Sequence, residues 1–177
     1  RGSGHEYRIL DYISQYDVPM ILPLEFPEKP NIDTPEDAMD EDLAELRHWY
    51  LAPENPARVA SAGIDFSFTT SEMDDLKNVL PNVRKAVHAG LDAETALAAL
   101  TINPANMLGI GETHGTLEEG KVANFIVSNG DLFTHQSAIS DVWVDGHLYR
   151  VNPAPTTDVR GEWTATSSNP MLSGDFS

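Results

Sequence analysis

The sequence of 177 residues has no cysteine and only 11 lysines and arginines, against 28 aspartates and glutamates. Without cysteine the chain can form neither a disulfide framework nor a thiolate zinc site, and it has no cysteine nucleophile. The formal net charge of −17 argues against a nucleic-acid partner, because binding to a phosphate backbone requires clustered basic side chains. Any metal site in this chain would therefore have to be built from histidines and carboxylates.

Long hydrophobic runs are also missing, since no apolar stretch approaches the roughly 20 residues of a membrane-spanning helix. The first six residues are polar and glycine-rich, unlike a signal peptide. We therefore expect no membrane partner. The chain starts without methionine on the turn Gly2-Ser3-Gly4, which indicates a segment cut from a larger protein.

Helix and strand patterns alternate over the first 109 residues. The apolar run Val18–Leu24 lacks polar alternation, which is typical of a strand covered on both faces of a parallel sheet, and Ile64–Thr70 is the next predicted strand. Apolar residues recur at helical spacing after Gly4. Further helices are predicted at 43–50, at 56–62, at 81–89, from Asp92 as N-cap to Leu100, and from Asn103 as N-cap to Leu108.

The segment 26–42 is rich in proline and acidic residues, and we expect it to form a long loop. Its carboxylates could line a calcium site, but their spacing does not match an EF-hand loop and the required glycine is missing. The alternative is a solvated loop that covers a substrate or only increases solubility.

Short strands are predicted beyond Gly109. The runs at 122–127, 142–144 and 148–151 are rich in β-branched and apolar residues, and Asp145-Gly146 is typical of a hairpin turn. A further strand-like stretch, Gly161–Thr166, has no obvious pairing partner in the chain. The patterns favour an α/β body followed by a small sheet.

One long stretch resembles the C-terminal segment of the amidohydrolase superfamily, in particular its imidazolonepropionase-like and dipeptidase-like metal-dependent hydrolases. The resemblance rests on Asn103-Pro104-Ala105, on Gly115-Thr116-Leu117-Glu118-Glu119-Gly120-Lys121 with the strand that follows, and on the hairpin Asp141–Leu148. It implies an α/β fold, the C-terminal part of a TIM-like (β/α)8 barrel followed by strands of a small β-sandwich domain.

The resemblance also implies domain boundaries. Residues 1–109 would be the last strands and helices of the barrel, 110–152 the β-sandwich strands, and 153–177 a linker with the start of a further β unit. A barrel of this type needs roughly 200 residues or more, so this chain cannot close one alone. We expect the rest of the barrel in the same chain, in another chain, or in a homo-oligomer.

The resemblance implies a divalent metal cofactor, Zn²⁺ or a similar ion, when the upstream ligands are present, and otherwise none. His5 would be a metal ligand after the sixth strand, with Glu6 as its neighbour. The other superfamily ligands, including a His-x-His pair, would lie upstream of Arg1. The alternative is that His5 caps a helix or contacts the substrate.

The chain departs from the superfamily pattern after the predicted eighth strand. Thr70 or Ser71 stands where an Asp would bind metal and act as general base, and a hydroxyl cannot accept a proton from metal-bound water near neutral pH. Glu72 and Asp74 are therefore the candidate catalytic residues. The candidate substrate-binding residues are Thr70, Ser71 and the loop residues His48, Trp49 and Tyr50.

The function implied by the resemblance is metal-assisted hydrolysis of a carbon-nitrogen bond other than an ordinary peptide bond. The partner would be a small-molecule amide or an amino-acid-like substrate. The alternative is a non-catalytic scaffold that has lost its metal ligands and binds a small molecule or a partner.

Overall fold

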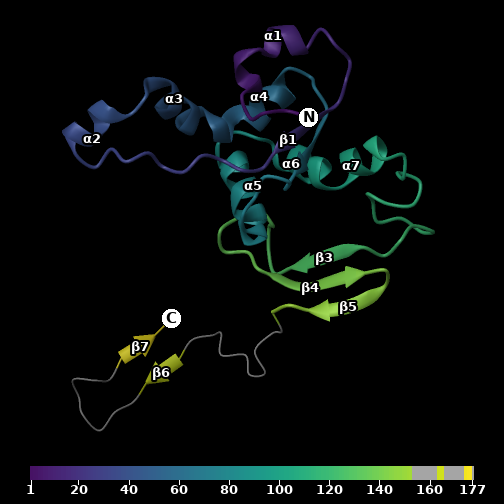
Figure 1. Ribbon diagram of the computed structural model, residues 1–177. Helices are drawn as coiled ribbons and strands as arrows, with labels where there is room; N and C mark the ends of the chain where they lie inside the picture. Colours follow the sequence, from purple (N-terminus) through teal and green to yellow (C-terminus); the bar gives the residue numbers. More distant parts are fainter. Residues whose placement is uncertain (153–162, 166–173, 177) are drawn as a thin grey trace.

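The structure, a computed structural model, describes residues 1–152, 163–165 and 174–176 of the chain. The strands of the described residues form three separate sheets (Figure 1). They are the parallel pair β1 (Met20–Pro23) and β2 (Phe66–Thr69), the antiparallel sheet β3 (Phe125–Ser128), β4 (Ile139–Val144) and β5 (His147–Arg150), and the antiparallel pair β6 (Trp163–Ala165) and β7 (Gly174–Phe176).

Helices pack against the parallel pair and make up most of the first 107 residues (Figure 1). In chain order they are η1 (Glu6–Arg8), α1 (Leu10–Ile13), α2 (Pro35–Asp40), α3 (Leu43–Leu51), η2 (Ala52–Glu54), α4 (Asn55–Ser61), η3 (Leu76–Asn78), α5 (Val79–His88), α6 (Ala93–Leu100) and α7 (Ile102–Met107), where η marks a 3-10 helix.

The core of the body lies between the parallel pair and the helices packed on it. Leu22 of β1 and Phe66 of β2 are buried, together with Val59 of α4 and Val83 of α5. Burial of such side chains stabilises a fold by roughly 1.5–3 kcal/mol each. Both strands predicted for the body are confirmed at their centres, and the parallel pairing agrees with the α/β prediction.

The described residues form a mixed α/β fold without a closed barrel, since the parallel sheet has two strands. The backbone N–H of Gly2 donates to the carbonyl of Ile21 at 2.8 Å, so the start of the chain lies beside β1. The small sheet at the C-terminal side is a single three-stranded antiparallel sheet.

The expectation of an unbroken loop over residues 26–42 is wrong, because α2 lies within it. Thr34 is its N-cap and accepts a hydrogen bond from the backbone N–H of Asp37 at 3.1 Å. Pro35 occupies the first helical position, where its fixed φ favours the helix and its missing N–H costs nothing. Proline therefore starts a helix here instead of interrupting one.

The predicted N-cap role of Asn103 is also wrong. The helix α7 begins at Ile102, and the side-chain amide of Asn103 donates to the carbonyl of Phe66 in β2 at 2.7 Å. A contact between segments distant in sequence thus replaces the local cap. The Asp92 cap is confirmed, because its carboxylate accepts from the backbone N–H of Thr95 at 3.0 Å.

The small sheet contains the predicted hairpin, with β4 and β5 joined by Asp145-Gly146. Both turn residues have positive φ, 49° for Asp145 and 76° for Gly146, as a two-residue hairpin turn of this type requires. The buried Arg84 of α5 connects the body to this sheet's loop, since its guanidinium donates to the carbonyls of Leu132 and Ser137.

The predicted strand Gly161–Thr166 is described only at 163–165, where it forms β6. It has a pairing partner in the chain after all, because Trp163–Ala165 pairs antiparallel with Gly174–Phe176. The remaining predicted residues of that stretch lie outside the described ones.

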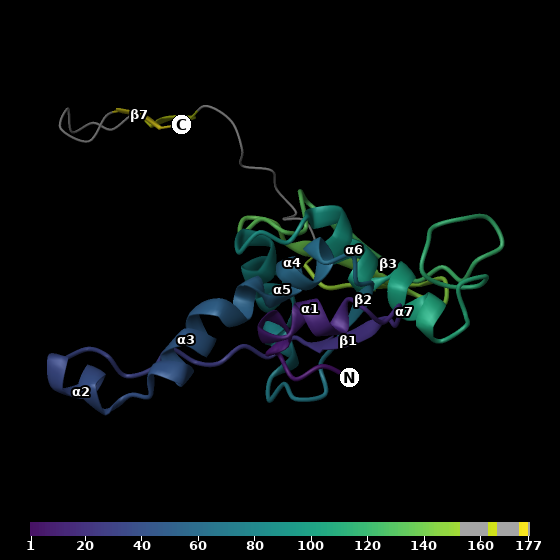
Figure 2. The ribbon, with the colours of Figure 1, turned by 90° about the horizontal axis from the view of Figure 1, so that it is seen from above.

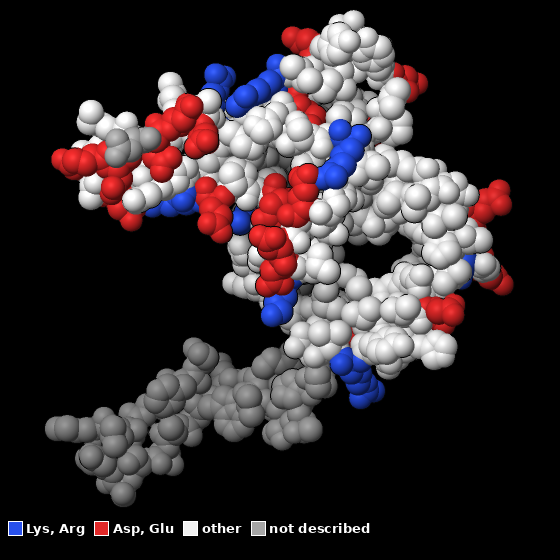
Figure 3. Space-filling view, viewed as in Figure 1, with Lys and Arg blue, Asp and Glu red and all other residues white. Residues whose placement is uncertain are grey.

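The helices α2 and α3 form an arm that projects from the body in both ribbon views (Figures 1 and 2). Acidic side chains gather over this arm in the space-filling view (Figure 3). Among residues 1–152, 163–165 and 174–176, no helix combines the length and the apolar character needed to cross a membrane.

Candidate functional site

A cleft of about 390 Å³ lies where β1 and β2 end at their carboxyl termini. In parallel α/β sheets this is the end at which ligands bind. Its wall comes from segments far apart in the sequence, and it is lined by Ser3, Gly4, Pro23, Glu25, Phe26, Pro27, Glu28, His48, Ala52, Asn55, Glu72 and Asp74. Three predicted site residues, His48, Glu72 and Asp74, thus share one cleft.

The imidazole of His5 stacks face to face on that of His48 beside this cleft. The ring centroids are 3.7 Å apart and the ring planes differ by 13°. The hydroxyl of Tyr7 lies 3.3 Å from Nδ1 of His48, and the guanidinium of Arg8 lies 5.6 Å from the centre of the Tyr7 ring. The stack joins α3 of the arm to the segment before β1.

Partial burial lowers the pKa of His48 below its ordinary value. The nearby His5 and Arg8 lower this pKa further, against an opposing effect of Glu6. The His48 imidazole is therefore neutral near pH 7, which lets two imidazole rings stack at close distance without charge repulsion.

Glu6, the predicted neighbour of a metal ligand, is buried with 3% of its surface exposed. Its carboxylate accepts hydrogen bonds from the backbone of Ser3 and Gly4 and from the side-chain amide of Asn55. Asn55 was not found from the sequence, because nothing in the local pattern distinguishes it from any residue that starts a helix. It is buried, lines the cleft and is the first residue of α4.

The residues after β2 differ in their surroundings. Glu72 pairs with the guanidinium of Arg1, with both side chains about half exposed. Asp74 lines the cleft, and Thr70 and Ser71 are exposed between β2 and these two carboxylates. The structure therefore brings the candidate acids to the cleft beside His48.

The two other predicted residues of the arm, Trp49 and Tyr50, do not line the cleft. Trp49 is half-buried in α3, and Tyr50 is 69% exposed on the same helix. Of the three consecutive arm residues predicted to line a pocket, His48 is the one that lines the cleft. The roles of Trp49 and Tyr50 stay predictions.

The donor set for a metal ion is small within the described part of the chain, which contains no group of three or more histidine and acidic side chains that could hold a metal. Nδ1 of His5 lies 3.3 Å from the carbonyl oxygen of Ser3. His5 is the residue before η1, but its imidazole makes no capping hydrogen bond to this helix. An imidazole whose Nδ1 is engaged by a backbone carbonyl presents Nε2 as its metal-binding atom. His5 thus fits a metal centre as one ligand.

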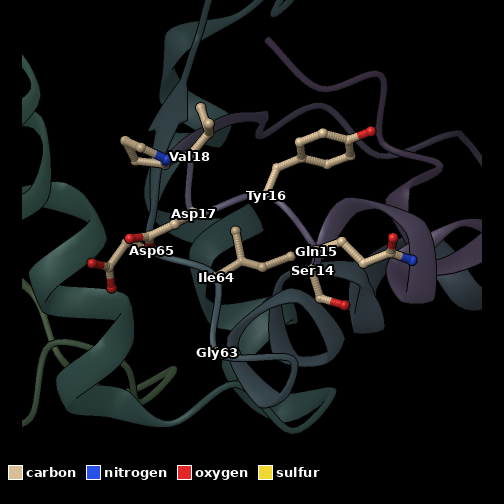
Figure 4. A pocket seen from close by; sticks show the side chains of 9 residues that line it. Ser14, Gln15, Tyr16, Asp17, Val18, Gly63, Ile64 and Asp65 are labelled. Carbon is tan, nitrogen blue, oxygen red and sulfur yellow. The ribbon is translucent and has the colours of Figure 1, made fainter.

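A second hollow, of about 230 Å³, lies at the opposite end of the same two strands (Figure 4). It is lined by Ser14–Pro19 and by Gly63–Asp65, so it carries the carboxylates of Asp17 and Asp65 and no histidine. Residues at the amino ends of parallel strands usually contribute to stability and not to catalysis.

A wider hollow, of about 560 Å³, lies between α5 and the loop before β4. Two of its lining residues, His88 and His135, have ring centroids 4.8 Å apart. Nδ1 of His88 lies 2.7 Å from the carbonyl of Arg84, in the last turn of α5, where a histidine favours the helix end. Both histidines are exposed, and none of the predicted site residues lines this hollow.

The parallel strands, the helices packed on them and a cleft at their carboxyl ends define a mixed α/β protein, as the sequence indicates. The sequence profile of the Amidohydrolase family matches residues 54–151, more than half of the 177 residues. The chain belongs to the amidohydrolase family.

Characterised relatives match shorter parts of the chain. An imidazolonepropionase of Acinetobacter baumannii (strain AB307-0294) is 45% identical over 58 residues, which are 33% of this chain and 14% of the relative. Adenine deaminase 2 of Jannaschia sp. (strain CCS1) is 33% identical over 103 residues, which are 54% of this chain and 16% of the relative. The chain thus spans about one seventh of the length of these relatives.

Solved structures show the same fold over a larger share of the chain. An amidohydrolase from Thermotoga maritima MSB8 has a TM-score of 0.62 at 24% identity, over 84% of this chain and 36% of the other. A Xaa-Pro dipeptidase with methionine bound in its active site has a TM-score of 0.51 at 21% identity, over 68% of this chain and 30% of the other. The imidazolonepropionase and dipeptidase resemblance is confirmed.

Proposed function

We propose that this chain is the C-terminal part of a (β/α)8 barrel in a metal-dependent hydrolase that acts on carbon-nitrogen bonds other than ordinary peptide bonds. Family membership supports the reaction class. The single observation that carries the proposal is the cleft at the carboxyl ends of β1 and β2, which is lined by His48, Glu72 and Asp74 and lies beside His5.

The proposal divides the chain as the sequence predicts. Residues 1–109 supply the last strands and helices of the barrel, residues 110–152 supply strands of a small β domain, and residues 153–177 form a linker with the start of a further β unit. The change from helices and a parallel pair, which end at Met107, to the antiparallel sheet that begins at Phe125 supports the first boundary.

In this proposal His5 supplies one imidazole ligand to a divalent metal, and the remaining ligands come from outside the chain. A bound Zn²⁺ or similar ion would polarise the scissile carbonyl and lower the pKa of its water ligand. The imidazole of His5 and the carboxylate-rich cleft beside it suit such an ion, because both supply ligand types that zinc accepts.

The carboxylates after β2 handle the proton in this proposal. Asp74 accepts the proton released by the attacking water, since Glu72 is already held in an ion pair with Arg1. Glu72, held by Arg1, lines the same cleft and is the second candidate catalytic carboxylate. Thr70, Ser71 and the neutral His48 orient a small amide or amino-acid-like substrate by hydrogen bonds.

The test uses the full-length protein that contains this chain. Its metal content is measured by mass spectrometry, and hydrolysis is assayed on a panel of cyclic amides and N-acyl amino acids. We expect about one or two equivalents of metal per chain, and substitution His5→Gln lowers both the metal content and the hydrolysis at least tenfold.

His147→Gln is the matched control, because Nδ1 of His147 also lies near the carbonyl of the residue two positions earlier, 3.0 Å away, but in the small sheet. We expect this variant to retain metal and activity. Absence of metal from the wild-type protein, together with absence of hydrolysis, would contradict the proposal.

A second candidate function is a non-catalytic scaffold that binds a small molecule. The observation that favours it is the exposed hydroxyl pair Thr70 and Ser71 at the end of β2, where the superfamily pattern implies an aspartate. The metal-free, inactive outcome of the same experiment, combined with saturable binding of a cyclic amide in calorimetry, would favour this function.

A further inference from the structure

The segment before β1 contains a buried carboxylate that the proposed reaction does not use. Glu6 is 3% exposed within this chain, although an ionised group is costly to bury unless its oxygens are hydrogen-bonded. Oε1 accepts from the backbone N–H groups of Ser3 at 2.5 Å and Gly4 at 3.2 Å, and the Ser3 hydroxyl lies 3.4 Å from it. The carboxylate therefore closes a tight turn around its own backbone.

The second oxygen of Glu6 ties this turn to the body. Oε2 accepts from the side-chain amide of Asn55 at 2.7 Å, and the amide oxygen of Asn55 accepts from the backbone N–H of Tyr7 at 2.8 Å. Asn55 thus bonds to residues on both sides of the His5–Glu6 peptide. Because α4 is packed through the buried Val59, the turn is held by a rigid part of the core.

The space around Glu6 also requires a particular neighbour. A Cβ added to Gly2 would lie 2.6 Å from Oε1 of Glu6, closer than real Cβ contacts, so this position needs a residue without a side chain. Gly2 and Glu6 together therefore enclose the turn in which His5 stands. The Glu6 carboxylate is therefore a buried group fixed by hydrogen bonds and not a solvated acid.

We propose that Glu6 is a positioning residue that, through Ser3, Gly4 and Asn55, fixes the turn Gly2–Tyr7 and so sets the orientation of the His5 imidazole at the cleft. The inference rests on the proposed function for the use of His5, but the geometry that carries it lies entirely within this chain. His48 completes the arrangement from the arm by stacking on the oriented ring at 3.7 Å.

The test exchanges donor and acceptor between Glu6 and Asn55 in the full-length protein. In Glu6→Gln, the NH₂ group of the new side chain replaces one carboxylate oxygen. It then faces either the NH₂ group of Asn55 or the backbone N–H groups of Ser3 and Gly4, so that two donors meet and a hydrogen bond is lost. In Asn55→Asp, two carboxylates meet at the 2.7 Å contact. In the double variant the amide introduced at position 6 can donate to the carboxylate introduced at position 55. The amide oxygen at position 6 still accepts from the N–H groups of Ser3 and Gly4, and the second carboxylate oxygen at position 55 still accepts from the N–H group of Tyr7. All of these hydrogen bonds are therefore restored.

The readout is the ¹⁵N chemical shifts and tautomer of His5 in histidine-labelled apo-protein, assigned with His5→Gln. We expect both single variants to change the His5 signals and the double variant to return them to the wild-type positions. Zn²⁺ affinity, measured by titration of the metal alone, should fall about tenfold or more in the single variants and recover in the double variant.

Val83→Ala is the matched control for general destabilisation, because Val83 is fully buried in α5 and contacts the core instead of the turn. It should lower the melting temperature and leave the His5 signals unchanged. Wild-type His5 signals in Glu6→Gln, or their failure to recover in the double variant, would overturn the inference. Wild-type protein that binds no Zn²⁺ contradicts the proposed function alone, because the His5 signals do not depend on metal.

Discussion

The two ends of the β1–β2 pair carry similar acidic side chains in different surroundings. The carboxyl end carries Glu72 and Asp74 in a cleft of about 390 Å³, and the amino end carries Asp17 and Asp65 in a hollow of about 230 Å³. Only the carboxyl end adds, among the lining residues, a histidine and a buried asparagine. The comparison teaches that the surroundings of a carboxylate, and not its presence, distinguish the two ends, and our proposal places the reaction at the carboxyl end.

The physical difference arises from the segments that leave and enter the strands. At the amino end the chain enters β1 and β2 through the short stretches 17–19 and 63–65. At the carboxyl end the chain leaves through the long segments 24–42 and 70–75, which can place side chains from several elements around one cleft. Long connections on a rigid scaffold are where binding residues concentrate.

The largest expected effect comes from removing one carboxylate at each end. In the full-length protein, Asp74→Asn should lower kcat for hydrolysis about a hundredfold or more, because a general base contributes roughly 10²–10⁴-fold. Asp65→Asn, the matched change at the amino end, should leave kcat within about twofold. Steady-state kinetics on an active amide substrate measures both. An equal loss in the two variants would remove the functional distinction between the ends.

A smaller effect is expected from a methyl group added at each end. Gly2→Ala places a Cβ 2.6 Å from Oε1 of Glu6 and should displace that carboxylate, which lowers hydrolysis about tenfold and reduces stability. Gly63→Ala meets no atom within 4 Å, but φ is +74°, so it should cost about 1–2 kcal/mol of stability without loss of activity.

Thermal unfolding and hydrolysis, measured on the same samples, separate these two expectations. Gly2→Ala with wild-type activity would show that the backbone before β1 does not shape the cleft. Gly63→Ala with a large loss of activity would remove the distinction between the two ends.

Local signals made much of the body predictable. The predicted helices agree within two residues with those at 43–51, 55–61 and 79–88, and Asp92 caps α6 as expected. The errors came where local rules competed with other contacts. Pro35 starts a helix because Thr34 caps it. Asn103 does not cap α7, and its side-chain amide donates to the carbonyl of Phe66 in β2 instead. A single sequence does not reveal which of these bonds prevails.

The candidate site was predictable in its chemistry and only partly in its geometry. The position of Glu72 and Asp74 follows from their place directly after a buried strand. The stacking of His5 on His48 joins residues 43 positions apart, and the burial of Glu6 depends on Asn55, 49 positions away. No periodicity encodes such pairs, because they arise from the packing of α3 and α4 against the turn.

The smallest expected effect concerns α6, which packs against β2 away from both hollows. The backbone N–H of Thr95, and then its hydroxyl, lower the pKa of the Asp92 carboxyl by hydrogen bonding to its charged form. In the unfolded chain this pKa is near about 3.9, so the unfolded state binds more protons around that pH. The stabilisation is therefore present above about pH 4 and is lost as the pH falls through the lower folded-state pKa.

Asp92→Asn separates this titration from the cap itself, because asparagine is an equally good N-cap and carries no charge. The wild-type protein should melt slightly above the variant at about pH 6, and the difference should shrink as the pH falls below about 4. Melting curves across this range, with hydrolysis near neutral pH as the second readout, check both expectations. A difference in melting temperature that stays constant with pH would mean that the charge of Asp92 does not contribute to the cap. A change in hydrolysis would show that α6 affects the carboxyl end through β2.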